Sequence, residues 1–518
     1  MQVQQLLEAG AERLPEHVAL VCDGHRLTYR ELDQAANRLG HALRAIGVRR
    51  GDRVAILLEN SVEAVVAIFG TLKAGGVFMV LHPDTKLDKL RYLLADAEPT
   101  ALVTEHSRIA LAADALAASS LRGVVWAGDT AQPLAASICS VAWSELERYP
   151  AERPASGAID VDLAALIYTS GSTGQPKGVM STHANMVAAT TSINAYLQNT
   201  ASDVILDVLP LAFDYGLYQL LLAFQVGARV VLASGFAFPA QTVTLMEEEQ
   251  VTALPGVPTL FALLLKYPGL LKRIPASLRY ITNTAAALPT SHIQELRAAF
   301  PTARLFSMYG LTECKRVSYL PPEELDRRPS SVGIAIPNTE VYIAGPDGQR
   351  LPPGEVGELV VRGSHVMRGY WRSPELTAVR YRPGPLPGEQ VLYTGDLFRM
   401  DADGYLFFVA RQDDIIKSRG EKVSPREIEN TVCLLDGVAA AAVVAAPDPL
   451  LGQAIGLVVE PRSGGALSER AVRAHCSRTL LDFMQPKYVT IVAELPRTEN
   501  GKVDKRSITE ELTRCAAS

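Results

Sequence analysis

Cysteine is scarce in this sequence, and the few cysteines are not spaced as metal ligands. Six occur among 518 residues, and no two of them form a C-x-x-C pair or a zinc-site spacing. The spacing therefore excludes a zinc-binding module as the basis of the chain's function. We expect buried thiols in a reducing compartment.

Long basic runs are also missing. The net charge is −6 and the isoelectric point is about 5.9, which argues against a general nucleic-acid surface. The first residues, MQVQQLLEAGAERLPEH, have no basic region followed by an apolar core, so we expect no signal peptide. We expect a cytoplasmic protein with no nucleic-acid partner.

No apolar run is long enough to cross a membrane without interruption. The longest candidate, residues 61–83, is broken by Glu63, Lys73 and the glycine pair at 75–76. These interruptions argue against a membrane span and hence against a membrane partner.

The sequence does contain ample material for buried sheets and helices. Its hydrophobic content is 48% with only 20% charged residues, and 518 residues exceed one ordinary core. Two or more domains are therefore expected. Residues 27–48 predict a helix, because apolar side chains recur there at helical spacing. That face comprises Leu32, Ala35, Ala36, Leu39, Ala42, Leu43 and Ile46.

Strand-like and helix-like segments alternate through the first 300 residues. Residues 52–60 indicate a buried strand, 61–76 a helix and 77–83 another strand. Such alternation predicts an α/β fold of parallel sheets flanked by helices. Further strands are expected at 101–106, 123–128, 163–169, 203–210, 228–234, 251–257 and 278–284.

The pattern changes after about residue 320. Proline and glycine become frequent, and short alternating runs at 339–345, 357–363 and 405–411 predict an antiparallel β subdomain. A polar junction at 411–424 precedes a compact α+β unit of plausible domain size. We therefore predict a large N-terminal domain over 1–412 and a small, mobile C-terminal domain over 413–518.

The stretch LIYTSGSTGQPKGVM at 166–180 runs from an apolar strand into a turn rich in hydroxyls and glycine. Glycines allow successive N–H groups to turn inward around an anion, so the turn is a candidate phosphate cradle. It does not match G-x-x-x-x-G-K-[ST], which disfavours a simple P-loop NTPase. A flexible surface turn is the alternative. The candidate phosphate ligands are Thr169, Ser170, Gly171, Ser172, Thr173, Gly174 and Lys177.

A second polar cluster is SMYGLTECKR at 307–316. Tyr309 beside Gly310 can stack on a planar ring, and Thr312 and Glu313 offer oxygen ligands to Mg²⁺. Alternatively, the YGLTE motif caps a helix.

Two further clusters lie nearer the C-terminus. Asp396 can accept both hydroxyls of a ribose, and Arg411 can hold a phosphate or the same ribose. Their alternatives are a turn residue after Gly395 and a surface ion pair. Lys502 follows an Asn-Gly step; it is either a solvated lysine or an electrophile near developing negative charge.

In this order and with these spacings, the motifs resemble the adenylate-forming superfamily: acyl-CoA synthetases, luciferases and adenylation domains of nonribosomal peptide synthetases. The resemblance spans nearly the whole chain. Its segments are 27–61, 72–83, YTSGSTGQPKGV, YGLTE, GELVVRGSHVMRGYW, YTGDL, ARQDDIIKSRGEKVSPREIE and LPRTENGKVDK.

The resemblance implies that a carboxylate attacks the α-phosphate of Mg·ATP, giving acyl-AMP and pyrophosphate, before a thiol captures the acyl group. Residues 169–177 would then hold the β- and γ-phosphates. Tyr309 would stack on adenine, Thr312 would contact the α-phosphate and Glu313 would bind Mg²⁺.

The resemblance also implies roles near the C-terminus. Asp396 and Arg411 would hold the ribose, and Lys502 would bridge the attacking carboxylate and the phosphate. Asp413 would be the hinge of a domain rotation that brings Lys417 into the site for thiol capture.

The same resemblance places Asp214 where the family pairs an aspartate with the α-ammonium of an amino acid. A buried carboxylate requires a partner, although Asp214 can instead cap the following helix. The other implied pocket residues are Tyr215, Tyr218, Pro255, Thr282, Thr284, Met308, Arg316 and Val317.

Two features of this pocket bear on the substrate. The two tyrosines narrow the pocket, so we expect a substrate with a small side chain. Arg316 either disfavours a basic substrate and suits an acidic or hydroxylated one, or points away from the pocket. Where the family commonly has Gly-Gly-Glu, this chain has TNTAAALP, which alters the expected adenine contacts of Asn283 and Thr284.

We find no Gly-Gly-x-Ser carrier attachment site and no H-H-x-x-x-D-G condensation motif. The resemblance therefore favours a free-standing ligase for natural-product biosynthesis. Its acceptor would be the phosphopantetheine arm of a carrier protein in trans, or coenzyme A, and proline is one guess for the amino acid.

Two alternatives remain. One is an acyl- or aryl-CoA synthetase in which Asp214 is structural. The other is a noncatalytic nucleotide-binding scaffold, which would have no need of the charges at Lys177, Glu313, Asp396, Arg411 and Lys502.

Overall fold

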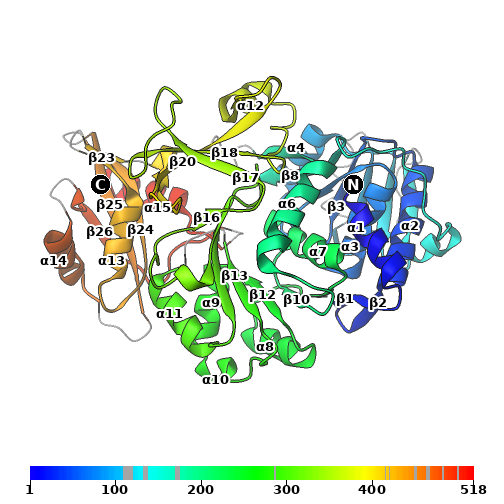
Figure 1. Cartoon of the computed structure of the whole chain (residues 1–518), viewed down its shortest axis with the longest axis horizontal. Coiled ribbons are helices and arrows are strands. Elements are labelled where there is room, and N and C mark those ends of the chain that lie inside the picture. The colour runs from blue at the N-terminus through cyan, green and yellow to red at the C-terminus, as the bar shows by residue number, and fades with distance from the viewer. Residues whose placement is uncertain are drawn as a thin grey trace. The chain divides into compact units, whose positions relative to one another are not determined.

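The computed structural model confirms the predicted mixed α/β class, with parallel-rich sheets in the large N-terminal part and a smaller C-terminal α+β part (Figure 1). The residues that it describes are 1–108, 121–131, 138–169, 176–284, 288–414, 416–418, 421–448, 452–462, 467–480, 484–498 and 501–517.

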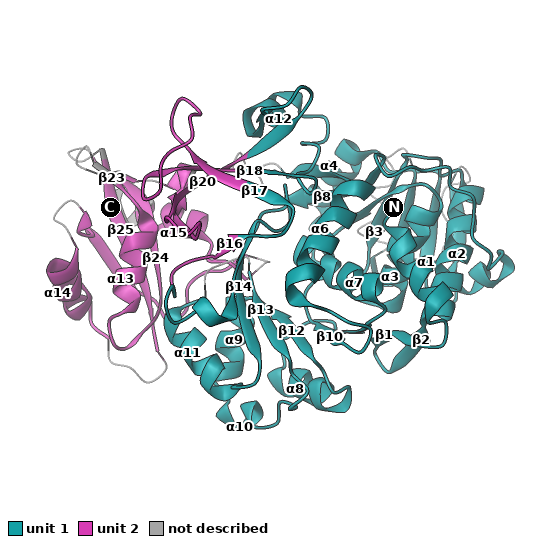
Figure 2. Ribbon diagram, viewed as in Figure 1, with its two compact units in different colours: residues 1–329, 335–340, 361–392 teal, residues 330–334, 341–360, 393–518 magenta. Residues whose placement is uncertain are grey.

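The chain forms two compact units (Figure 2). Unit 1 comprises 1–329, 335–340 and 361–392, and unit 2 comprises 330–334, 341–360 and 393–518. Compactness does not identify a hinge, so a domain boundary at 412/413 stays a prediction.

Unit 1 contains a seven-stranded sheet in the order β7-β6-β5-β3-β4-β8-β9. Neighbouring strands are parallel except for β8 and β9, which form an antiparallel hairpin at one edge. The strands are β3 (Arg53–Leu57), β4 (Val77–Val80), β5 (Ala101–Glu105), β6 (Gly123–Ala127), β7 (Cys139–Ala142), β8 (Leu163–Thr169) and β9 (Lys177–Thr182).

A second sheet has nine strands in the order β16-β15-β14-β13-β12-β10-β11-β1-β2. Its central strands are parallel, whereas β1–β2 and β14–β15 pair antiparallel. The strands are β1 (Val18–Cys22), β2 (His25–Thr28), β10 (Val204–Asp207), β11 (Arg229–Leu232), β12 (Ala253–Gly256), β13 (Tyr280–Asn283), β14 (Arg304–Tyr309), β15 (Ser318–Leu320) and β16 (Ile334–Ala335).

The helices of unit 1 begin and end where local sequence dictates. The predicted helix at 27–48 is α2, which starts with a Thr28–Glu31 capping box and ends at Gly47 with a φ of 107°. The helices are α1 (Gln4–Arg13), α2 (Tyr29–Ile46), α3 (Val62–Lys73), α4 (Leu87–Ala97), α6 (His183–Leu197), α7 (Asp214–Val226), α8 (Pro239–Glu248), α9 (Pro258–Leu265), α10 (Pro268–Leu271), α11 (Thr290–Ala299) and α12 (Pro374–Arg380).

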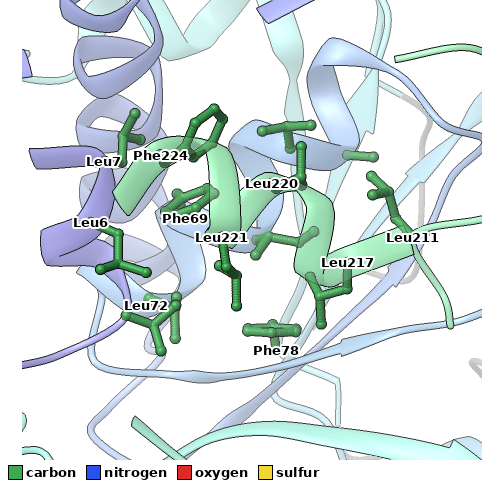
Figure 3. Close-up of a cluster of buried hydrophobic side chains, with 14 of the residues drawn as sticks. Leu6, Leu7, Phe69, Leu72, Phe78, Leu211, Leu217, Leu220, Leu221 and Phe224 are labelled. Atoms are coloured by element: carbon green, nitrogen blue, oxygen red, sulfur yellow. The ribbon is translucent and has the colours of Figure 1, made fainter. Parts of the chain in front are cut away.

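Helix α7 is held in the main apolar core of unit 1. Its side chains Leu217, Leu220, Leu221 and Phe224 pack with residues of α1 and α3 (Figure 3). The rings of Phe69 and Phe224 lie 5.4 Å apart. Burying this face stabilises α7 by about 1.5–3 kcal/mol per large side chain and fixes the position of its first residue, Asp214.

A buried ion triad ties α1, α2 and α3 together. Lys73 Nζ lies 2.8 Å from Glu8 Oε1 and 2.8 Å from Asp33 Oδ1. The exposed fractions of these side chains are 0%, 6% and 12% respectively. Such a triad depends on the presence of every member, because removing one leaves buried charge uncompensated.

We expect Lys73→Met to lower the free energy of unfolding by about 3 kcal/mol. This loss of stability lies at the lower end of the range usual for breaking a buried ion pair, because Arg153 Nε lies 3.3 Å from Glu8 Oε1 and still compensates part of the carboxylate charge. Urea denaturation measures it, with exposed Lys266→Met as the control. A loss under about 0.5 kcal/mol, typical of surface substitutions, would contradict this account of the triad.

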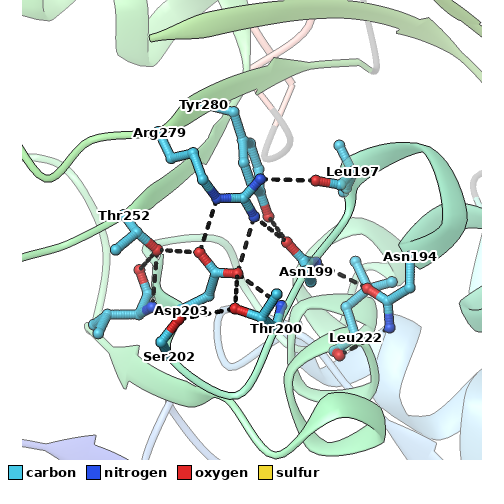
Figure 4. Close-up of polar contacts among 11 residues, drawn as sticks. Asn194, Leu197, Asn199, Thr200, Ser202, Asp203, Leu222, Thr252, Arg279 and Tyr280 are labelled. Atoms are coloured by element: carbon cyan, nitrogen blue, oxygen red, sulfur yellow. Dashed lines mark hydrogen bonds and ion pairs between the residues drawn. The ribbon is translucent and has the colours of Figure 1, made fainter. Parts of the chain in front are cut away.

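A polar network joins three parallel strands at their amino ends (Figure 4). Asp203, Thr252 and Arg279 directly precede β10, β12 and β13. The Asp203 carboxylate accepts bonds from Thr252 Oγ1 at 2.7 Å and Arg279 Nη2 at 2.9 Å. Burial acts to raise the pKa of Asp203, but these bonds outweigh it and lower the pKa. This network holds the amino ends of β10, β12 and β13 together. Because the three strands are parallel, their carboxyl ends also lie together, at the opposite edge of the sheet.

A five-stranded sheet, in which β19 and β21 pair antiparallel with β20, corresponds to the predicted β subdomain and contributes residues to both units. Its order is β17-β18-β20-β19, with β21 also paired to β20. The strands are β17 (Thr339–Ala344), β18 (Val356–Gly363), β19 (Tyr381–Pro383), β20 (Gln390–Met400) and β21 (Leu406–Arg411).

The end of the chain forms the expected α+β unit. Its sheet has the order β23-β22-β25-β24, with β26 paired to β25. The elements are β22 (Ile416–Ser418), β23 (Glu421–Val423), α13 (Pro425–Cys433), β24 (Val438–Asp448), β25 (Gly452–Pro461), α14 (Glu469–Thr479), β26 (Tyr488–Ile491) and α15 (Lys505–Ala517).

Two composition-based expectations can be compared with the described residues. Cys22, Cys314 and Cys476 are buried, but Cys139 is exposed at the start of an edge strand, so the expectation of buried thiols is wrong there. No described helix is both long and apolar enough to cross a bilayer.

Candidate active site

The glycine-rich turn joins the two strands of the edge hairpin. Thr169 and Lys177 are register partners at the base of that turn, where β8 ends and β9 begins. The predicted phosphate ligands Ser170, Gly171, Ser172, Thr173 and Gly174 lie outside the described residues. The hairpin therefore presents Thr169 and Lys177 together at one edge of the sheet.

The segment before α12 runs alongside β9. Trp371 N donates to Gly178 O at 2.7 Å, and Met180 N donates to Gly369 O at 2.9 Å. These bonds place the Tyr370 ring beside Lys177, with Nζ 5.7 Å from the ring centroid. At this distance the ammonium is attracted to the ring face.

Tyr370 also contacts Glu313. Its Oη donates to Glu313 Oε1 at 2.6 Å, and Met367 N donates to the Glu313 carbonyl at 2.9 Å. Two of the predicted motifs, the glycine-rich turn and YGLTE, therefore meet through one buried tyrosine within unit 1. The sequence alone does not single out Tyr370, whose only signal is its place in the segment GYW.

The YGLTE motif forms a turn between β14 and β15. Val317 N donates to Tyr309 O at 2.9 Å, which closes the turn. A Cβ at Gly310 would lie 2.1 Å from the Lys315 carbonyl oxygen, so only glycine fits there. The alternative that this motif caps a helix is wrong; Thr312 and Glu313 are half-buried in the turn.

A group of side chains near the ends of β12, β13 and β14 forms what we call the Asp214 cluster: Asp214, Tyr215, Tyr218, Thr282, Lys315 and Arg316. Tyr215 Oη lies 2.7 Å from Thr282 Oγ1 and donates to Thr282 O at 3.0 Å. Burial raises the pKa of Tyr215 to about 12, so its hydroxyl is neutral at physiological pH. Arg316 Cζ lies 5.2 Å from the Tyr215 ring, so this guanidinium faces the cluster.

Asp214 differs from the sequence-based interpretation in two ways. Its side chain is 24% exposed rather than fully buried. It is also the first residue of α7 and not its cap, since Phe213 occupies the N-cap with no side-chain cap bond. A carboxylate in the first turn still suits the positive end of the helix dipole. Lys315 Nζ lies 4.0 Å from Asp214 Oδ2, an ion pair that the sequence alone does not reveal.

The remaining predicted pocket residues are buried around these strand ends. Pro255 and Thr282 are register partners on β12 and β13, and Met308 accepts a bond from Tyr196 Oη at 3.0 Å. Asn283 and Thr284 are buried at the end of β13, and Val317 is fully buried.

The predicted ribose ligands pair with each other in unit 2. Asp396 and Arg411 are cross-strand partners on β20 and β21, with Arg411 Nε 3.3 Å from Asp396 Oδ1. Asp396 is therefore a strand residue rather than a turn residue, and Arg411 forms the ion pair that its alternative interpretation expected.

The other unit 2 candidates lie in loops and short elements. Lys502 is exposed between Gly501 and Val503. Asp413 lies in the short 3-10 helix η4 (Gln412–Asp414), and Lys417 pairs with Lys422 across β22 and β23. The side chains of Asp413 and Lys417 are outside the described part of the chain.

The described residues include no group of three His, Cys, Asp or Glu side chains arranged as a metal site. Mg²⁺ commonly binds through one or two carboxylates together with substrate phosphates, so Glu313 fits this role. Glu313 would supply the protein oxygen, and the ion would neutralise phosphate charge.

Comparison with known proteins identifies the family. The model of the AMP-binding enzyme family matches residues 7–371, and that of the AMP-binding enzyme C-terminal domain matches 427–502. The chain belongs to the AMP-binding enzymes. Their wider group, the adenylate-forming superfamily, is the one that the sequence motifs resemble.

Relatives of this AMP-binding enzyme include surfactin synthase subunit 1 of Bacillus subtilis and tyrocidine synthase 2 of Brevibacillus parabrevis. Each is 32% identical to it over 98% of this chain. The chain spans only 14% of the length of either protein.

Solved structures of proteins similar in length to this chain also match it over nearly all of their residues. ATP-bound MatB from Rhodopseudomonas palustris has a TM-score of 0.89 and 30% identity, over 99% of this chain and all of that one. The anthranilate CoA ligase AuaEII in complex with anthranoyl-AMP has a TM-score of 0.88 and 25% identity, over all of this chain and 98% of that one. Together with the family, these matches support ATP binding and ATP-dependent acyl-adenylate formation.

Proposed function

We propose that this AMP-binding enzyme activates a small amino acid with ATP and loads it onto a carrier protein. The first step forms an aminoacyl-adenylate and releases pyrophosphate. The second transfers the aminoacyl group to the phosphopantetheine thiol of a separate carrier, in the cytoplasm. Proline remains one candidate amino acid.

The observation that carries the adenylation step is the convergence of Lys177 and Glu313 on Tyr370. Lys177 is a cation at the base of the glycine-rich turn. Glu313 offers carboxylate oxygens to a metal ion, and one of them accepts a hydrogen bond from Tyr370 Oη at 2.6 Å. A triphosphate needs a counter-charge and a metal-binding carboxylate in one place, and these side chains supply both.

We assign the remaining adenylation roles as follows. Thr169 and the glycine-rich turn hold the β- and γ-phosphates, Thr312 contacts the α-phosphate and Tyr309 stacks on adenine. Asp396 and Arg411 hold the ribose. Lys502 stabilises the charge that develops as the carboxylate attacks phosphorus and pyrophosphate leaves.

The amino-acid assignment rests on Asp214. Its carboxylate is partly exposed at the start of α7, beside the two buried tyrosines of the Asp214 cluster. A substrate ammonium placed there gains both a counter-charge and aromatic ring faces.

A second candidate function is an acyl- or aryl-CoA synthetase. The observation that favours it is the 4.0 Å separation of Lys315 Nζ and Asp214 Oδ2, because the chain itself then supplies a cation to Asp214. In that case the acid needs no amino group and coenzyme A is the acceptor.

ATP–pyrophosphate exchange across a panel of amino acids and simple carboxylic acids separates these functions. The proposal predicts exchange with a small amino acid at least about tenfold faster than with its des-amino analogue, since the analogue lacks the ammonium that would bond to Asp214. Faster exchange with the des-amino acid favours the CoA synthetase. ATP binding without any exchange favours the noncatalytic scaffold.

A further inference from the structure

Lys315 is a buried cation to which the activation chemistry assigns no role. It lies in the turn between β14 and β15, and its side chain is only 3% exposed. Its Nζ lies 5.2 Å from the Tyr218 ring centroid and 4.0 Å from Asp214 Oδ2. Among the described residues, this Nζ has no hydrogen-bond acceptor.

This placement is energetically unfavourable in two respects. A buried ammonium without hydrogen bonds has lost its hydration, which is energetically costly. In addition, Lys315 has a φ of 64°, a backbone conformation rare for side chains other than glycine. Strain and unsatisfied polar groups of this kind concentrate at functional sites.

A purely structural counter-charge is expected to approach its carboxylates more closely. The fully buried Lys73 shows this arrangement, with its Nζ 2.8 Å from both Glu8 and Asp33. Lys315 Nζ stays beyond hydrogen-bond distance of Asp214, so its donors remain available to a bound molecule.

The charges around Lys315 favour an oxygen-bearing ligand. Arg316 adds a second buried cation, and burial raises the pKa of Asp207, which lies near Tyr215, well above its usual range and so disfavours its charged form. Asp214 is the carboxylate within the cluster, and the neighbouring Glu313 accepts a hydrogen bond from Tyr370 Oη at 2.6 Å. Lys315 Nζ makes no hydrogen bond to either carboxylate, so this buried cation can still take an oxygen atom of a ligand as its partner.

We propose that Lys315 is a specificity-determining residue whose ammonium binds a side-chain hydroxyl or carboxylate of the substrate. This inference rests on the proposed function for the substrate's amino group, which Asp214 binds. The substrate class is thereby narrowed to small amino acids with an oxygen acceptor in the side chain, and proline is disfavoured.

The test measures affinities for nonhydrolysable 5′-O-(acylsulfamoyl)adenosines by calorimetry. The acyl groups form matched pairs that differ by an oxygen acceptor: threonine against valine, and aspartate against leucine. Each pair is repeated without the amino group, as 3-hydroxybutanoate against 3-methylbutanoate and succinate against 4-methylpentanoate. The proteins are wild type, Lys315→Met and the exposed control Lys266→Met.

We expect wild type to bind the oxygen-bearing member of at least one pair at least about tenfold more tightly, as hydrogen bonds to charged groups allow. Lys315→Met should remove most of this preference, and Lys266→Met should keep it. Should Lys315→Met fail to fold, the ratio of wild-type affinities within each matched pair still tests whether the site prefers an oxygen-bearing side chain.

The test distinguishes failure of the role proposed for Lys315 from failure of the proposed amino-acid function. Equal affinity within every pair in wild type, or an unchanged preference in Lys315→Met, overturns the role of Lys315. Tighter binding of the amine-free analogues, with the oxygen preference retained, overturns the amino-acid function while supporting Lys315. Binding of no analogue overturns both.

Discussion

Lys502→Ala is expected to abolish acid-dependent ATP–pyrophosphate exchange, whereas Lys417→Ala leaves it largely intact and slows thioester formation. Removing a positioned donor from a developing negative charge commonly costs about 10²–10³ in rate, and exchange reports only the adenylation step. We propose that Lys417 acts only in the thiol-capturing pose, so its removal should affect the second step alone.

Exchange and single-turnover loading of the thiol acceptor measure the two steps separately. Lys505→Ala serves as the control in the same region, because its Nζ contacts Glu429 at 2.8 Å and it has no proposed role. Equal losses in both assays for both variants would refute the domain rotation about Asp413.

The second large effect is expected for Glu313→Gln. The change keeps a hydrogen-bond acceptor for Tyr370 but removes the negative charge that we propose binds Mg²⁺. We expect exchange to fall about 100-fold or more at physiological Mg²⁺, with partial recovery at higher Mg²⁺, since the metal stabilises transferring phosphate charge.

Tyr370→Phe is the matched variant for this test. It keeps the carboxylate and removes only one hydrogen bond, so we expect a loss of about tenfold or less. Exchange measured against Mg²⁺ concentration separates the variants. If Glu313→Gln were no worse than Tyr370→Phe, Glu313 would act as a structural partner of Tyr370 and not as a metal ligand.

Helices and strands whose signals are local were predictable. Helix α2 follows from the spacing of Leu32, Leu39 and Leu43, which are buried, together with its cap at Thr28. The antiparallel pairs at the sheet edges were not predictable from alternation alone. In β14 and β15, for example, the pairing depends on a turn that only Gly310 allows.

The candidate site was predictable as a set of motifs but not as a set of contacts. Lys177 and Glu313 stand out because charged residues within glycine-rich or aromatic motifs are conspicuous. Tyr370 and Lys315 do not stand out in the sequence. Tyr370 matters because it contacts Glu313, more than 50 positions away, and Lys315 matters because it lies near Asp214, more than 90 positions away. Burial of Lys315 is likewise a tertiary property that no local pattern reveals.

The central claim is that Tyr309, Thr312, Asp396 and Lys502 act on one acyl-adenylate. The most direct measurement is a crystal structure with a bound 5′-O-(aminoacylsulfamoyl)adenosine. We predict adenine stacked on Tyr309, the ribose hydroxyls on Asp396, and Lys502 within hydrogen-bond distance of the sulfamoyl group. An analogue bound with its ribose away from Asp396, or its sulfamoyl group away from Thr312, would contradict the account.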